Sequence, residues 1–145
     1  MPSAGDYQFF QRHYTSKNID RTILAAHTST DHANVINPKT ASHQIWIQKV
    51  VVAITTHADQ DIAFQDGAGT PVLIARWFDE ATAGTARPND LPTIVFDFGP
   101  QGTPLTIGEE LDIILSAAGI AARVHIEPYE KLGAAIAYDS GAANQ

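Results

Sequence analysis

The sequence predicts an all-β fold, an antiparallel β-sandwich whose leading topology is a jelly roll, with an extended N-terminal arm. Two observations indicate this class: apolar, β-branched runs recur with glycine and proline turn signals between them, and strands do not alternate with helices. The chain has 145 residues, of which 44% are hydrophobic and 17% charged, enough for one globular domain with a sizeable core. We expect about eight strands.

The chain is predicted to divide into an N-terminal arm, residues 1–42, and a β-sandwich body, residues 43–145. Residues 16–42 are rich in Thr, Ser, Asn, His and Asp, and their one short apolar patch is at 23–26. This composition indicates an extended arm or a chain of loops rather than a core layer.

Four aromatic residues lie at the start of the arm: Tyr7, Phe9, Phe10 and Tyr14. They favour a strand, or a segment anchored against apolar surface. The polar stretch after them cannot bury enough apolar surface to order itself, and the aromatic side chains are costly to leave in water. We therefore take these four as candidate contacts with a partner or a neighbouring subunit. The alternative is that they form an edge strand of the same sandwich.

The body begins with its strongest strand, residues 45–54. This run is too apolar to face water on one side throughout, which favours a central strand that is covered on both faces or passes under the arm. Residues 61–65 and 70–77 flank Asp66-Gly67-Ala68-Gly69, whose glycines are expected to supply the positive φ of a tight hairpin. Further strands are expected at 93–98, 111–116 and 122–127.

Gly99 and Gly102 are assigned to the turn that follows strand 93–98. We predict that these glycines turn the chain toward the segment containing Leu105, and that Pro100 and Pro104 stiffen the link. If either glycine has positive φ, its replacement by a residue with a Cβ atom should be strained. Side-chain chemistry is secondary in this turn.

Helix signals are poor. The alanine-rich segment 81–86 contains Gly84 and is followed by Pro88, and the alanine-rich tail 133–145 ends in glycine and polar residues. We expect at most one short helix.

No catalytic, cofactor-binding or metal-binding set is predicted. His57, Asp59 and Asp61 stand at alternate positions and could collect a hard cation, but no glycine there folds the backbone around an ion, so a solvated loop is favoured. The six histidines lack a zinc-binding pattern, and no serine lies in a G-x-S-x-G motif. Neighbouring Glu109 and Glu110 point to opposite faces of a strand and are poorly placed as a dyad.

Trp46 and Trp77, with Phe78, could form a sugar-stacking platform. Both tryptophans lie within strongly apolar strand patterns. A role in the core or in a subunit interface is therefore favoured.

The charge and cysteine content limit the partners. Sixteen acidic and nine basic residues give a net charge of −7, so the chain has no general electrostatic reason to bind nucleic acid or an anionic membrane. There is no cysteine, which excludes a disulfide framework, and no apolar run approaches the ~20 residues of a spanning helix. Residues 1–14 lack the pattern of a signal peptide, so no export signal is expected.

Three runs of the body carry a likeness to known proteins. They are FQDGAGTPV at 64–72, FDFGPQGTPLTIGEEL at 96–111 and LSAAGIAARVHIEPY at 115–129. These runs resemble small virion proteins of tailed bacteriophages, the head decoration or cement proteins, and the similarity covers residues 43–131. The resemblance implies a β-sandwich that assembles as trimers on the outside of an icosahedral shell and braces the major capsid protein, with no catalytic residue or cofactor.

We therefore expect a structural virion protein, without catalysis, that is made in the host cytoplasm, binds the capsid exterior and stabilises the shell. The expected partners are the major capsid protein and the sister subunits of a homotrimer, with no nucleic acid and no membrane. The apolar content of 45–54 and 70–78 exceeds what one sandwich of this size needs, which also points to a homotrimer. The alternative function is a carbohydrate- or receptor-binding module of a phage tail or lectin-like protein, which requires an exposed aromatic platform.

Overall fold

The computed structural model describes residues 13–14, 17–79 and 91–133. These residues form nine strands and one short 3-10 helix. In chain order they are β1 (His13–Tyr14), β2 (Ile19–Ile23), η1 (Ser29–His32), β3 (His43–Thr56), β4 (Gln60–Asp66), β5 (Leu73–Asp79), β6 (Thr93–Asp97), β7 (Thr103–Pro104), β8 (Leu111–Leu115) and β9 (Ala121–Leu132).

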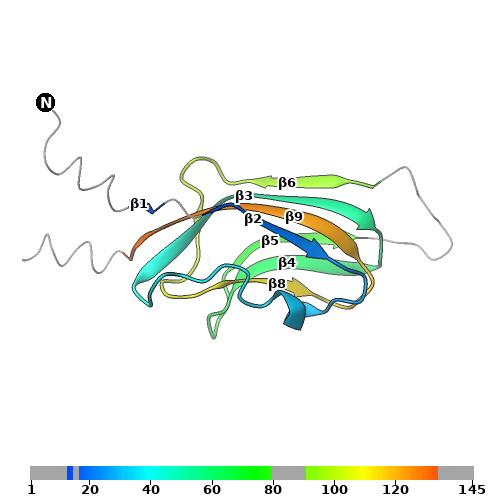
Figure 1. Ribbon diagram of the computed structural model, residues 1–145, viewed down its shortest axis with the longest axis horizontal. Coiled ribbons are helices and arrows are strands. Elements are labelled where there is room, and N and C mark those ends of the chain that lie inside the picture. The colour runs from blue at the N-terminus through cyan, green and yellow to red at the C-terminus, as the bar shows by residue number, and fades with distance from the viewer. Residues whose placement is uncertain (1–12, 15–16, 80–90, 134–145) are drawn as a thin grey trace, which may run out of the picture.

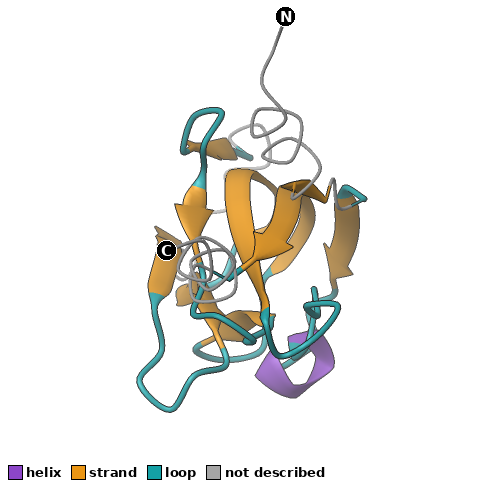
Figure 2. Ribbon diagram, turned by 90° about the vertical axis from the view of Figure 1, so that its left-hand side faces the viewer, coloured by secondary structure: helices purple, strands orange, loops and turns teal. Residues whose placement is uncertain are grey.

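The strands form two antiparallel sheets that pack face to face (Figures 1 and 2). Sheet A has the order β1-β9-β3-β6, with β2 also paired to β9 and β7 also paired to β3. Sheet B has the order β5-β4-β8. The all-β sandwich is therefore confirmed, while the jelly-roll strand order stays a prediction.

The core lies between the sheets, and β3 shows how the sequence fills it. Ile45 and Ile47 are buried, and then the inward phase moves by one residue, so that Val50 and Val52 are buried next. A β-bulge between Ile47 and Lys49 causes the change, because one extra residue reverses which side chains face inward. The apolar run is thus central, and within the described residues it faces the core on one side, so cover on both faces is not found there, while passage under the arm stays a prediction.

The interpretation of residues 16–42 as loops outside the core is wrong for strand β2 and for Val35 and Ile36. Strand β2 pairs with β9 along its whole length, and Ile23 is fully buried in the core. Val35 and Ile36 join the same core after η1. Because a sandwich edge needs only a few inward apolar side chains, a mostly polar segment can complete it.

The hairpin of β4 and β5 is confirmed, but its glycines do not have positive φ. Asp66, which is fully buried, organises the turn instead: one carboxylate oxygen accepts the Val72 N–H at 2.9 Å and the Ala68 N–H at 3.3 Å. The other oxygen accepts the Thr106 N–H at 2.8 Å. Burial acts to raise the pKa of Asp66, but these hydrogen bonds outweigh burial and hold the pKa below its ordinary value.

The turn after β6 contains the two predicted glycine positions, and both are confirmed. Gly99 has φ 78° and Gly102 has φ 72°. A Cβ atom on Gly102 would lie 2.7 Å from the Ile47 carbonyl oxygen, whereas one on Gly99 would meet open space. The same turn is therefore tightly packed at one glycine and free at the other.

The helical content agrees with the expectation of at most one short helix within the described residues. Helix η1 has four residues, and no helix in the described part of the chain is long and apolar enough to cross a membrane. The alanine-rich segments 81–86 and 134–145 lie outside the described residues.

Candidate functional site

Of the four aromatic residues predicted as contacts, the structure describes one. Tyr7, Phe9 and Phe10 lie outside the described residues. Tyr14 lies in β1, where it pairs with Glu130 of β9. For His13 and Tyr14 the chain therefore forms an edge strand of the same sandwich.

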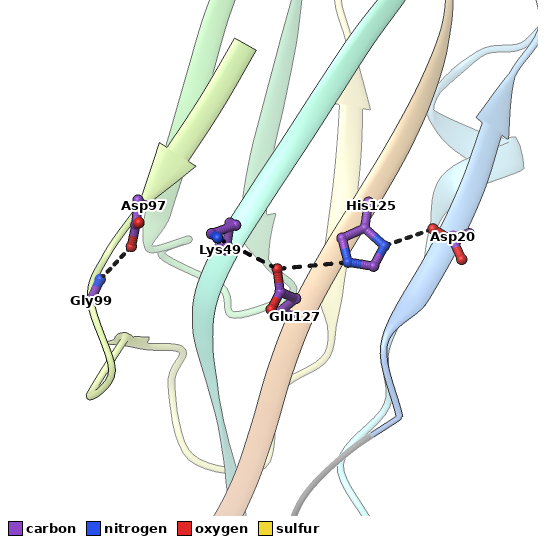
Figure 3. Close-up of polar contacts among 6 residues, drawn as sticks. All are labelled: Asp20, Lys49, Asp97, Gly99, His125 and Glu127. Carbon is purple, nitrogen blue, oxygen red and sulfur yellow. Dashed lines mark hydrogen bonds and ion pairs between the residues drawn. The ribbon is translucent and has the colours of Figure 1, made fainter. Parts of the chain in front are cut away.

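A row of polar side chains crosses the outer face of sheet A (Figure 3). The His125 Nδ1–H on β9 donates to Asp20 on β2 at 2.7 Å, and His125 Nε2 lies 3.7 Å from Glu127. Glu127 in turn lies 3.9 Å from the Lys49 ammonium on β3. The register brings these residues together, because Asp20 pairs with His125 and Lys49 pairs with Glu127.

Beyond Lys49 the row ends at an open depression of about 340 Å³. Its lining residues are Gln48, Lys49, Asp97, Gly99, Pro100 and Glu127. Asp97 holds the turn by accepting the Gly99 N–H at 2.9 Å. The carboxylates of Asp20, Glu127 and Asp97 lie on this face with the ammonium of Lys49, so it has no positive field that would attract a polyanion. Such a face suits contact with another protein surface.

The three aromatics of the possible sugar platform are not brought together. Trp46 lies on the outer face of sheet A, where its ring stacks on Tyr129 with centroids 6.1 Å apart and the Lys131 ammonium lies 4.1 Å from its centre. Trp77 and Phe78 lie in sheet B, and as neighbours on one strand they point to opposite faces.

Sheet B exposes large apolar side chains on its outer face at β5, with one arginine among them. Pairing with β4 places Leu73, Arg76 and Phe78 on this face, with the Arg76 guanidinium 5.6 Å from the centre of the Phe78 ring. Phe78 is 60% exposed, Leu73 50% and the adjacent Val72 41%. We call these four residues the β5 patch. The sequence carried a signal for it, since the apolar content of 70–78 exceeded the need of a single sandwich.

The opposite edge of sheet B is covered by the chain itself. The Ser29 hydroxyl accepts the Leu115 N–H at 2.8 Å and donates to the Leu115 carbonyl at 3.0 Å. Ile36 pairs with Leu111 in an isolated β-bridge, and the Asn34 N–H donates to Asp112. We call residues 28–36 the closing segment, because they occupy the free edge of β8.

The possible cation site at His57, Asp59 and Asp61 does not assemble. The His57 Nδ1 atom lies 2.8 Å from a carboxylate oxygen of buried Asp79, whose other oxygen accepts the Ala58 N–H. Within residues 13–14, 17–79 and 91–133, no group of three or more His, Cys, Asp or Glu could hold a metal ion. Asp79 follows His57 by 22 residues, and sequence spacing gave no sign of this pair.

Comparison with known proteins gives no relative. The chain matches no family model, and no curated protein and no solved structure is significantly similar to it.

Proposed function

We propose that this chain is a structural virion protein that binds the outer surface of a phage capsid as a homotrimer and stabilises the shell without catalysis. The observation that carries the proposal is the β5 patch, an exposed apolar surface on a two-sheet body. Contiguous apolar patches of this kind mark sites of protein association. The likeness of three of its sequence runs to head decoration proteins supplies the class of partner.

In this proposal, the β5 patch forms the contacts between copies of the chain in the trimer. A trimer with threefold symmetry needs a heterologous contact, in which the patch meets a different surface of the next copy. Phe78 and Leu73 are the anchors, because large apolar side chains at the centre of an interface contribute most of its energy.

The capsid contacts are assigned to the residues that precede β1 and to the outer face of sheet A. Tyr7, Phe9 and Phe10 supply apolar anchors, and the row from Asp20 to Lys49 supplies complementary charges of both signs. Three copies in one trimer multiply these contacts, since linked weak contacts gain effective concentration. The major capsid protein is the proposed partner, with no role for nucleic acid or membrane.

Addition of the purified chain to phage shells that lack it tests the proposal. We expect cryo-electron microscopy to reveal trimers on the shell exterior, and the decorated shells to withstand higher temperature than bare shells. A chain that begins at His13 removes the aromatic anchors but keeps every described strand, so we expect it to fold, trimerise and occupy far fewer sites. Undiminished occupancy of this shortened chain would refute the capsid contact assigned to residues 1–12.

The place of truncation matters for this test. A chain that begins at Ser42 loses Ile23, Val35 and Ile36 from the core. Its failure to bind would then report unfolding rather than loss of an attachment device.

The alternative, a carbohydrate-binding module, has one observation in its favour, the stacked pair of Trp46 and Tyr129 on an outer face. Titration with a glycan array or with soluble oligosaccharides, followed by tryptophan fluorescence, tests it. Binding that is lost in Trp46→Ala and kept in Trp77→Phe would support this alternative over the capsid proposal.

A further inference from the structure

Two histidines lie in contact beside the closing segment. The Nδ1 atom of His27 is 3.0 Å from the Nε2 atom of His32, and their ring centres are 4.9 Å apart. His32 is the last residue of η1 and is only 2% exposed. The pair therefore lies where β2 passes into the segment that covers β8.

The contacts of this pair fix where its protons are. The Leu24 N–H points at His27 Nδ1 at 3.1 Å, so this nitrogen is an acceptor and carries no proton. The hydrogen between the rings must then belong to His32 Nε2. In the neutral His32 ring, Nδ1 is therefore without a proton, and it is buried with no hydrogen-bond partner in the described residues.

Neither ring can take up a second proton in this arrangement. A proton on His27 Nδ1 would face two donors, Leu24 N–H and His32 Nε2–H, in place of accepting from them. A proton on His32 Nδ1 would be a buried charged donor without an acceptor, which is costly.

We infer that the His27–His32 pair is an acid-sensitive latch: the closing segment stays on β8 while the buried His32 imidazole is neutral and leaves it when that ring becomes protonated. The inference concerns regulation and is independent of the proposed virion function. Release would uncover the β8 edge, whose Leu111 and Leu115 backbone groups now bond to the closing segment. A bare strand edge is a template for pairing with another chain.

The surrounding charges agree with this direction. Burial, then the neighbouring His27 and Arg21 side chains, lower the pKa of His32, while Asp31 opposes them. The strand packed against η1, β8, contains one titratable residue, Asp112, whose carboxylate accepts the Asn34 N–H. Because the pKa of His32 is lower in the closed state than in the open state, closure is favoured above the open-state value near 6.5 and is lost as the pH falls below it.

Amide hydrogen exchange in the full chain tests the latch residue by residue. Leu115 N–H and Leu111 N–H, bonded to Ser29 and Ile36, report closure, and Val51 N–H in central β3 is the reference. After correction for intrinsic exchange, we expect the opening equilibrium at Leu115 to rise about tenfold from pH 7.5 to pH 5.5, because closure keeps His32 neutral. Protection of Val51 should change much less.

Variants separate the latch from general acid sensitivity. His27→Asn keeps an acceptor near Nδ1 and His32→Gln keeps a donor near Nε2, and neither replacement titrates. The double variant should lose the pH response at Leu115, whereas His125→Gln, a matched change on the outer face of sheet A, should keep it. An equal response in the double variant and the wild type would overturn the inference.

A measurement on the unmodified protein covers the case in which the double variant does not fold. Nitrogen-15 chemical shifts report which ring nitrogen carries the proton. At pH 7.5 we expect the proton on Nε2 in both His27 and His32. A proton on Nδ1 of His27 at that pH would contradict the latch directly.

Discussion

The two edges of sheet B differ in whether another part of the chain covers them. The β8 edge is covered by the closing segment, which satisfies Leu111 and Leu115 with hydrogen bonds from Ile36 and Ser29. Strand β5 lies at the other edge (Figure 1) and has β4 as its one partner strand among the described residues. It carries the β5 patch.

The difference separates an edge that the chain covers itself from the strand to which we assign contacts between copies. A sheet edge that is covered within the chain needs nothing from outside, whereas an exposed apolar edge invites association. Changes at the β8 edge should therefore alter folding stability, and changes at the β5 edge should alter assembly.

The largest contrast in folding stability is expected from equal truncations at the two edges. Ile36→Ala in the closing segment should lower the free energy of unfolding by about 2–5 kcal/mol, because it leaves a cavity in the core. Leu73→Ala in the β5 patch should change it by no more than about 0.5 kcal/mol, measured where the chain is monomeric. Equal losses in urea unfolding would show that the two edges do not differ in this way.

A second contrast lies within the turn after β6. Gly102→Ala should cost about 2–4 kcal/mol, since it combines a positive φ with a Cβ atom 2.7 Å from the Ile47 carbonyl oxygen. Gly99→Ala meets open space and should cost only the backbone strain, about 1–2 kcal/mol. Thermal melts that are unchanged in both variants would refute the assignment of this turn.

The hydrogen bonds of the closing segment give a smaller effect. Ser29→Ala leaves the Leu115 N–H and carbonyl without their hydroxyl partner and should cost about 1–3 kcal/mol. Thr93→Ala, at an exposed position of edge strand β6, is the matched control and should be close to neutral. Chemical denaturation of the two variants under the same conditions measures the difference in their free energies of unfolding.

The smallest effect is expected on the outer face of sheet A. Glu127→Gln weakens the contacts to Lys49 and His125, but these groups are partly exposed and water screens them. The free energy of unfolding should fall by less than about 0.5 kcal/mol, and the difference should shrink further as salt is added. A loss comparable with that of Ser29→Ala would mean that this row is structural rather than a surface for contact.

The strands could be predicted because their signals are local. The turn at Gly99 and Gly102 followed from the glycines and prolines after strand 93–98, and the strand at 45–54 followed from its β-branched residues. The one-sided burial of that strand could not be predicted, since it depends on a bulge that reverses the inward phase after Ile47.

The positions of the polar segments and the residues of the candidate site were harder to predict, because they depend on contacts between residues that are distant in the sequence. Ser29 bonds to Leu115, which is 86 residues away, and buried Asp66 holds a turn that the glycines next to it were expected to make. Single polar residues of this kind leave no periodic pattern. The β5 patch was visible as apolar excess, but its outward direction needed the pairing of β5 with β4.

The central claim is that the β5 patch joins copies of the chain, and sedimentation velocity of the patch variant tests it most directly. The wild type should sediment with three times the chain mass at tens of micromolar protein. The Leu73→Ser/Phe78→Ser variant should stay folded and sediment as a monomer, while Val95→Ser, at an equally exposed valine on the outer face of sheet A, should remain trimeric. A wild-type monomer, or a patch variant that keeps the wild-type mass, would contradict the account.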